Sequence, residues 1–306
     1  MTAYRFYAGD IGVYALAAFS YALPRWTSRL AHQWSTTMAR RPFTLAASTA
    51  VAAAALAASF ATHASAQEFR IETDVFIGEE ETSASHSVTL FEKSAVYEFN
   101  ENPGEIIVYR PGDEGRPAQF ILLDLASQQR TDVEADRVEK LMGKLSQWAA
   151  SHKDPLIQFS AAPKFDESYD QQSGVLTLSS PQWTYKAATI EAEDAAVLER
   201  YQDFIDRYTK LSTMLQNAPP PGPRLSLNAA LARHGVVPVE IQRTTGGDDK
   251  NAVRATHLFS WRLSREDRAR LDEAQTFLAN FEKVDNEAFI AARTQKDKPV
   301  VRGQSN

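Results

Sequence analysis

Apolar and polar residues alternate with a period of two in many short segments from Phe69 onward, and this pattern constrains the fold more than any other feature. In the first segment, residues 69–77, the polar positions include Arg70, Glu72 and Asp74. Such spacing is typical of a strand that buries one face. We expect further strands at 86–90, 95–100, 105–110, 156–160, 174–179, 182–190, 236–243 and 252–263. The continuous apolar run at 120–125 predicts a central strand.

The connections between these segments indicate how the strands pair. The loops at 101–104 and 170–174 are short and rich in turn-forming residues, as hairpin loops are. Short turns join antiparallel neighbours, whereas parallel strands need long crossovers. The sequence therefore predicts an α+β fold, in which a strongly curved antiparallel β-sheet of about eight to ten strands has helices packed on it.

Helical spacing predicts three substantial helices and one shorter one. The first should begin where Thr131 and Glu134 form a capping-box pattern. The longest should span 193–216, the short one should run from a cap at Ser226 to Gly235, and the last should begin at Ser264. The expected apolar stripe of the first helix consists of Val138, Leu141, Leu145 and Trp148. The longest helix has a stripe of Val197, Tyr201, Phe204, Tyr208, Leu211 and Leu215, which we interpret as a core face rather than a partner surface.

The segment Ala-Pro-Pro-Pro-Gly-Pro at 218–223 must end the longest helix, because each proline restricts itself and the residue before it. We interpret it as a stiff, extended strap inside one domain. A domain boundary at this point is the alternative.

Residues 43–62 form an uncharged, alanine-rich run that follows Arg40 and Arg41 and precedes Ala64-Ser65-Ala66. A basic region, an apolar region and a small-residue site in this order are typical of a secretory signal peptide. We expect cleavage after Ala66 and a periplasmic or secreted product without a transmembrane anchor. An uncleaved anchor is the alternative, since the run is about long enough to span a bilayer. The paired arginines leave the choice between Sec and twin-arginine export open.

The expected organisation of the chain follows from this leader. Met38 begins a good signal-peptide start, so residues 1–37 are interpreted as an upstream mis-start and residues 38–66 as the signal peptide. Residues 67–293 should form a single α+β domain, and residues 294–306 a charged, disordered tail.

Composition narrows the partners and the chemistry. The chain has no cysteine, which excludes disulfides, thiolate metal sites and cysteine catalysis. The formal net charge of the chain, -6, disfavours nucleic acid as a partner. The expected mature segment 67–306 has 28 basic and 38 acidic residues, so its net charge of -10 disfavours anionic membrane surfaces. The sequence contains no GxSxG, GxxxxGK[ST], GxGxxG or HExxH motif. The histidines beyond the leader are too far apart for a local zinc signature, so we expect no metal and no cofactor.

One histidine stands out. His257 falls on the expected apolar face of the strand at 252–263, together with Phe259 and Trp261. It is a core residue, a gate to a cavity or a general base, and we expect it to be buried and neutral. Trp183 and Tyr185 share a face of another strand. In a curved sheet these five residues could line a ligand cavity, although aromatic rings can also simply fill a core.

Three functions remain open. The first is an exported, non-catalytic protein that binds or carries an apolar or amphiphilic ligand such as a lipid. The second is an extracytoplasmic hydrolase that uses His257 with a carboxylate. The third is a structural or envelope-assembly protein without a ligand.

Three stretches carry a resemblance: QFILLDLASQQRTDV at 119–133, PPPGPRLSLNAALARHGVVPVEIQ at 219–242 and HLFSWRLSREDRARLDEA at 257–274. They resemble segments of signal-peptide-bearing bacterial proteins of planctomycete type, a family with no assigned activity, so no functional residue can be carried over. The order of strands and helices is also similar to that of the LolA-type periplasmic lipoprotein carriers. This resemblance implies a half-barrel sheet with a helical lid. Those carriers begin with a helix, however, whereas here a strand begins at Phe69.

Overall fold

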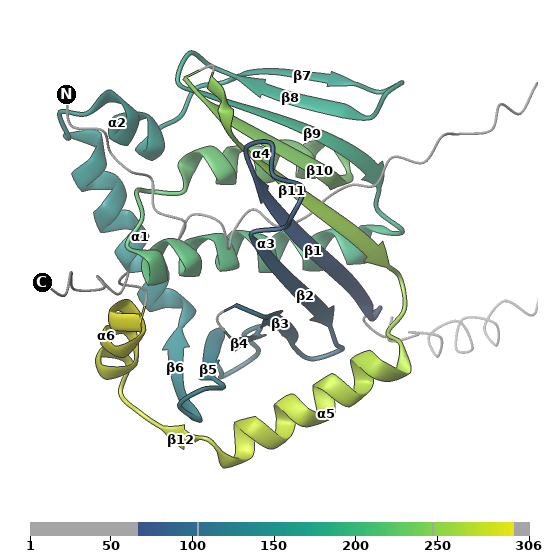
Figure 1. Cartoon of the computed structure of the whole chain (residues 1–306), viewed down its shortest axis with the longest axis vertical. Helices are drawn as coiled ribbons and strands as arrows, with labels where there is room; N and C mark the ends of the chain where they lie inside the picture. The colour runs from purple at the N-terminus through teal and green to yellow at the C-terminus, as the bar shows by residue number, and fades with distance from the viewer. Residues whose placement is uncertain (1–66, 103, 247, 297–306) are drawn as a thin grey trace, which may run out of the picture. The chain divides into compact units, whose positions relative to one another are not determined.

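The alternating segments form one continuous sheet in the computed structural model, which describes residues 67–102, 104–246 and 248–296 (Figure 1). This part of the chain is α+β, with a twelve-stranded sheet that does not close and six helices. The strand order is β12-β6-β5-β4-β3-β2-β1-β11-β10-β9-β8-β7. All neighbours pair antiparallel except β12 and β6, which pair parallel over two residues. The predicted fold class is confirmed, but the predicted number of strands was too low.

The strands are β1 (Phe69–Ile77), β2 (Ser85–Phe91), β3 (Val96–Asn100), β4 (Glu105–Arg110), β5 (Gln119–Asp124), β6 (Gln129–Glu134), β7 (Asp166–Asp170), β8 (Val175–Ser179), β9 (Trp183–Glu191), β10 (Val236–Thr245), β11 (Asp248–Ser260) and β12 (Glu282–Lys283). The helices are α1 (Ala135–Ala150), α2 (Pro155–Ala161), α3 (Ala195–Gln216), α4 (Gly222–His234), α5 (Arg265–Asn280) and α6 (Asn286–Lys296).

Two segments adopt a different secondary structure from the one that the sequence predicts. Residues 156–160 were predicted as a strand and lie in α2. Pro155 occupies the first turn of α2, and the Asp154 carboxylate accepts a hydrogen bond from the Leu156 amide at 2.8 Å. This pair favours a helix start over a strand. Conversely, Thr131 and Glu134 form no capping box, because both lie in β6, where the Thr131 hydroxyl bonds to Asn286 at 2.8 Å.

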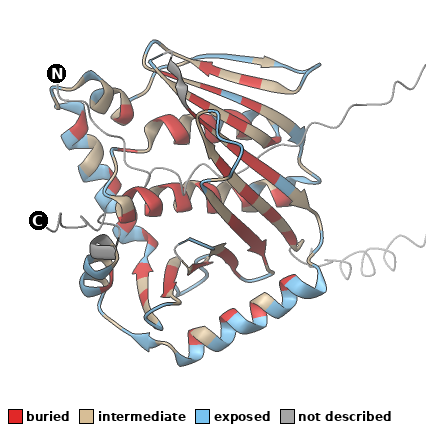
Figure 2. Cartoon of the chain, in the orientation of Figure 1, coloured by how far each residue is buried: buried red, intermediate tan, exposed pale blue. Residues whose placement is uncertain are grey.

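Helices cover both faces of the sheet in different places. On one face, α1, α3 and α6 pack over β1 to β6 and α4 packs over β8 to β10. We call this the inner face. On the opposite face, α5 covers β2 to β5 through Leu271, Ala274 and Leu278. Figure 2 shows buried residues along α3 and α4, whereas α5 exposes most of its surface. The capping box predicted at Ser264 is present, with Asp267 as its partner.

The predicted stripe of α3 is buried along its whole length, which confirms it as a core face. Asp194 caps the N-terminus of α3 by accepting a hydrogen bond from the Val197 amide. The stripe predicted for α1 is confirmed only in part: Val138 is buried and Leu145 packs against the inner core, but Leu141 is 39% and Trp148 51% exposed. The side chains of α1 that are buried include Val138 and Met142.

The proline strap is shorter than expected, because α4 begins at Gly222, four residues before Ser226. A Cβ atom at Gly222 would lie 2.4 Å from the Ser160 carbonyl oxygen and 2.9 Å from Pro163 Cδ. Only a glycine allows α2 and α4 to approach this closely at Gly222.

Gly222→Ala is therefore expected to lower the free energy of unfolding by about 1–3 kcal/mol, because backbone must move to make room for the methyl group. Gly143→Ala in α1 is the matched control. Outside the neighbouring residues and the backbone of the helix itself, no atom lies within 4 Å of the added Cβ, so this substitution should raise the stability by about 0.5–1 kcal/mol. Urea denaturation measures both changes. Equal effects of the two substitutions would contradict the close packing of α2 against α4.

The ends of the chain are only partly described. The predicted mis-start and signal peptide, residues 1–66, lie outside the described residues, as do 297–306 of the predicted tail. Helix α6 continues to Lys296, beyond the predicted end of the domain at residue 293. Among the helices that the structure describes, none has the length and apolar character needed to cross a membrane.

Candidate ligand site

A row of buried polar side chains crosses the inner face of the sheet. It consists of Glu98 on β3, Thr89 and Ser87 on β2, Thr73 on β1 and His257 on β11. The register places them side by side, because Glu98 pairs with Thr89, and Thr73 pairs with both Ser87 and His257. These strands lie beside one another in the middle of the sheet, with α3 along their inner face (Figure 1). We call these five residues the polar row.

Hydrogen bonds connect members of the polar row. The Thr89 hydroxyl donates to the Glu98 carboxyl group, and Thr73 Oγ1 lies 3.1 Å from His257 Nδ1. Burial raises the pKa of Glu98, while the hydroxyl groups of Thr89 and Ser87 act in the opposite direction. The Glu98 carboxyl therefore accepts a proton more readily than an exposed one would.

Helices α3 and α4 place further polar groups against this face. Arg224 on α4 and Tyr201 on α3 are each only 2% exposed. Arg224 Nε donates to Asn228 Oδ1 at 3.0 Å, and Asn228 Nδ2 donates to Asp206 Oδ1 at 2.7 Å. Asn228 thus connects the guanidinium of Arg224 to the Asp206 carboxylate on α3.

Four of the buried polar atoms that have no hydrogen-bond partner among the described residues lie on Arg224, Tyr201 and His257. They are Arg224 Nη1, Arg224 Nη2, Tyr201 Oη and His257 Nε2. They come from α4, α3 and β11, three elements that are distant in sequence. We call Arg224, Tyr201 and His257 the donor cluster. Buried polar atoms are rarely left without a partner in folded proteins, so this concentration requires an explanation.

Electrostatic effects show that the members of the donor cluster influence one another. Burial lowers the pKa of His257 well below its ordinary value, and the charge of Arg224 lowers it further. Burial raises the pKa of Tyr201, while Arg224 opposes this shift and Asp206 adds to it. At neutral pH the imidazole is therefore uncharged and the phenol protonated. In the tautomer in which Nδ1 accepts a hydrogen bond from the Thr73 hydroxyl, the proton of His257 is on Nε2, and Nε2 can then donate.

The residues predicted to line a ligand cavity fall into two groups. The ring of Phe259 lies 6.4 Å from that of His257, 5.2 Å from that of Trp261 and 6.1 Å from that of Tyr201. His257 itself is 3% exposed, so its predicted burial is confirmed. Trp183 and Tyr185 pack instead in the core beneath α4. The register places Tyr185 beside Arg243, and Arg243 beside Val253, four residues before His257. The five residues therefore do not surround one point.

Sequence reasoning missed Arg224, Tyr201 as a polar group, and Glu98. Arg224 directly follows the proline strap, where a charged residue is easily interpreted as exposed. Glu98 follows Val96 at the strand period of two, so its place on the inner face could have been recognised.

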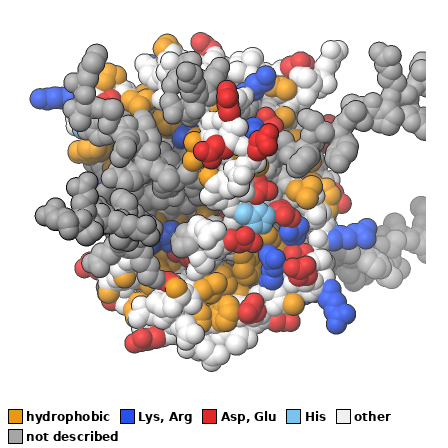
Figure 3. All heavy atoms as spheres, in the orientation of Figure 1, with side chains coloured by type: hydrophobic (Ala, Val, Ile, Leu, Met, Phe, Trp, Pro, Cys, Tyr) orange, Lys and Arg blue, Asp and Glu red, His pale blue; other side chains and the backbone are white. Residues whose placement is uncertain are grey.

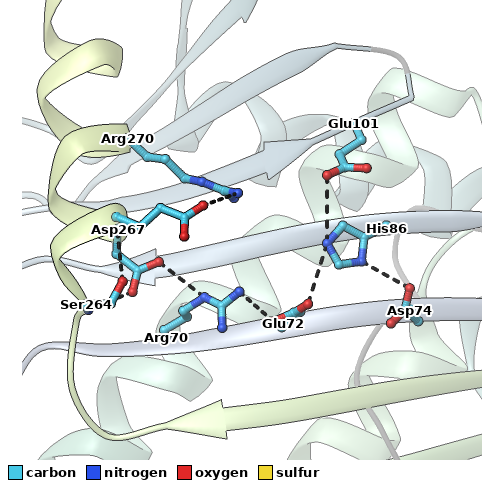
Figure 4. Close-up of polar contacts among 9 residues, drawn as sticks. Arg70, Glu72, Asp74, His86, Glu101, Ser264, Asp267 and Arg270 are labelled. Atoms are coloured by element: carbon cyan, nitrogen blue, oxygen red, sulfur yellow. Dashed lines mark hydrogen bonds and ion pairs between the residues drawn. The ribbon is translucent and has the colours of Figure 1, made fainter.

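A second polar set lies on the opposite face of β1 and β2, where Figure 3 shows acidic, basic and histidine side chains side by side. Arg70 Nε lies 3.2 Å from Asp267 Oδ1, and His86 Nδ1 lies 3.0 Å from Asp74 Oδ1 (Figure 4). A cleft of about 160 Å³ opens beside Arg70 and Asp267. These groups already pair with one another. No group of His, Asp or Glu side chains in the described residues could hold a metal ion.

The burial of His257 predicts a pH dependence of stability. Above the ordinary histidine pKa of about 6.5, both the folded and the unfolded chain carry a neutral ring. Below it the unfolded chain binds a proton that the folded protein resists, because the pKa of His257 is lowered by burial. His257 should therefore cause a loss of stability as the pH falls, of up to about 1.4 kcal/mol per pH unit, until the folded-state pKa is reached.

The His257→Phe variant isolates this contribution. At pH 8 it should fold and lose about 1–3 kcal/mol, because the hydrogen bond with Thr73 is removed. As the pH is lowered through 6, the variant should lose stability less steeply than the parent, and Glu98 cancels in the comparison because both proteins contain it. Urea denaturation between pH 5 and 8 gives both profiles. Parallel profiles would show that His257 titrates normally in the folded protein.

Searches against protein-family models and curated protein sequences found no match for this chain. The function is therefore inferred from the geometry of the described residues.

Proposed function

We propose that this chain is an exported, non-catalytic protein that binds or carries an amphiphilic ligand between α3 and the inner face of the sheet. The observation that carries the proposal is the donor cluster, whose four buried polar atoms lack partners among the described residues. The rings of Phe259 and Trp261 beside His257 offer an apolar surface next to these donors. A ligand with one polar end and an apolar body satisfies both features.

The hydrolase alternative requires a base that is oriented by a carboxylate. His257 instead contacts the hydroxyl group of Thr73, and its other ring nitrogen has no hydrogen-bond partner among the described residues. A structural protein with a completely filled core accounts for the aromatic packing but not for the unpartnered donors. The geometry therefore favours binding over both alternatives.

The resemblance to LolA-type carriers is consistent with this proposal. The sheet is open, and α3 and α4 lie along its inner face, which agrees with the half-barrel sheet and helical lid that the resemblance implies. Because one fold can support many functions, the similarity is secondary support, and the main argument for the proposal is the donor cluster.

Native mass spectrometry of the protein purified from its own cell envelope tests the proposal. We expect an adduct of discrete mass that is lost after the protein is unfolded, washed and refolded. We also expect the refolded protein to melt at a lower temperature, because a ligand that binds only the folded state stabilises it. Absence of an adduct, with equal melting temperatures before and after refolding, would contradict the proposal.

Export forms a separate part of the proposal, supported by the basic, apolar and small-residue regions of 38–66. Protein recovered from outside the cytoplasm should begin at Gln67 when its N-terminus is sequenced. Full-length protein retained in the cytoplasm would contradict export and leave the proposed binding site unaffected.

A further inference from the structure

We infer that the polar end of the ligand is a single anionic oxygen group, a carboxylate or a phosphate, bound by Arg224, Tyr201 and His257. This inference rests on the proposed function and specifies the class of ligand.

The first argument is the geometry of Arg224. Its Nε is used by Asn228, which leaves the two terminal nitrogens, Nη1 and Nη2, without partners among the described residues. Guanidinium N–H groups are arranged in a fork that matches the two oxygens of a carboxylate or phosphate. Arg224 is also held in position through Asn228 and Asp206, so little side-chain freedom remains to be lost on binding.

The second argument is charge. A guanidinium that is 2% exposed needs a negative partner, because a buried charge is costly when unpaired. Arg224 is connected to the Asp206 carboxylate only through Asn228, which is hydrogen-bonded to both residues. Burial also raises the pKa of Asp206, which makes its negative charge easier to lose. An anionic ligand would supply the missing charge directly.

The third argument concerns the two neutral members of the cluster. Tyr201 Oη and His257 Nε2 can each donate a hydrogen bond without adding charge. All three members of the donor cluster can therefore donate, which suits a group that only accepts hydrogen bonds. A cationic head group such as a quaternary ammonium is excluded, because the positive charge of Arg224 would repel it.

Probes that differ only in the polar end test the inference. Affinities of the refolded, ligand-free protein are measured by calorimetry for dodecanoate, dodecyl phosphate, 1-dodecanol, acetate and inorganic phosphate, all below micelle concentrations. Dodecanoate or dodecyl phosphate should bind about ten- to a hundredfold more tightly than dodecanol, as expected for hydrogen bonds to a charged group. Comparison of these two acids shows whether the carboxylate or the phosphate is preferred.

Variants of the donor cluster identify the groups responsible. Arg224→Met should weaken dodecanoate at least tenfold and leave dodecanol unchanged, whereas Arg224→Lys should be intermediate, because it keeps the charge and loses the fork. If Arg224→Met does not fold, Tyr201→Phe replaces it in the test. This variant removes one unpartnered hydroxyl and should also weaken dodecanoate without affecting dodecanol. Arg116→Met, whose side chain is exposed and pairs with Asp113, should leave every affinity unchanged and is the matched control.

The outcomes separate the inference from the proposed function. Equal binding of dodecanoate and dodecanol, unchanged in Arg224→Met, would overturn the anionic head group and support an amphiphile site. If acetate or phosphate binds as tightly as its dodecyl counterpart, the ligand is an anion but needs no apolar chain. This result would support the anionic head group and overturn the proposed binding of an amphiphile. Binding of none of the five probes would overturn both.

Discussion

Arg293→Met is expected to lower the free energy of unfolding by about 3–5 kcal/mol, because it leaves a buried carboxylate without its cation. Arg293 on α6 donates to the carboxylate of Glu105 on β4. The side chain of Glu105 is only 5% exposed, and that of Arg293 is 20% exposed. Methionine retains much of the apolar length of arginine, so the loss reports mainly on charge. Urea denaturation at neutral pH measures the change.

Two further variants test whether the loss of stability comes from the unpaired charge of Glu105. Arg116→Met removes a cation from an exposed pair with Asp113 and should leave the unfolding midpoint unchanged, because water and salt screen such pairs. Adding Glu105→Gln to Arg293→Met removes the orphaned charge and should restore part of the lost stability. If the double variant is as unstable as the single one, packing rather than charge explains the effect.

The pair of Glu105 and Arg293 also illustrates what sequence reasoning could not reach. The predicted domain ended at residue 293 and helix α6 was not predicted, since no local pattern links Arg293 to a glutamate 188 residues earlier. Helix α6 owes its position to Phe289, which joins the inner core, and to this long-range ion pair. Local periodicity contains no information about either contact.

The strands were the most predictable part of the fold. Alternation in β1 and the hairpin of β3 and β4 follow from residue order alone, because a strand with two different faces has a period of two. Strands β7 and β12 were missed for the opposite reason. Strand β7 lies at one edge of the sheet and is mostly exposed, and β12 has only two residues, so neither has an apolar face to recognise.

The candidate site was only partly predictable. His257 was placed on the inner face by alternation, and its burial is confirmed. Its helical neighbours were not foreseen, because the meeting of Arg224 and Tyr201 with β11 depends on how α3 and α4 cross the sheet. Trp183 and Trp261 were expected to line one cavity, but they belong to different packing clusters. Sharing a face of a sheet does not bring residues together when they lie far apart along the strands.

Phe204→Ala is expected to lower the free energy of unfolding by about 3–5 kcal/mol, the usual cost of removing a buried aromatic ring. Phe204 lies in the middle of α3, is 3% exposed and packs against three other aromatic rings. Its centroid is 5.5 Å from that of Phe91, 6.1 Å from that of Tyr109 and 5.3 Å from that of Tyr208. These contacts hold α3 against the inner face of the sheet. Leu141→Ala, at an exposed position on α1, is the control and should change stability by less than about 0.5 kcal/mol.

The same substitution distinguishes the stability of α3 from its role in binding. Tyr201 lies one turn before Phe204, on the same buried face of α3. A large loss of stability means that the surrounding core does not collapse into the space left by the ring. Helix α3 then stays in place, Tyr201 keeps its position in the donor cluster, and the preference for dodecanoate over dodecanol should be unchanged. A loss below about 1 kcal/mol would instead indicate that α3 shifts to fill the space. Tyr201 would then move with it, and the preference for the acid should fall.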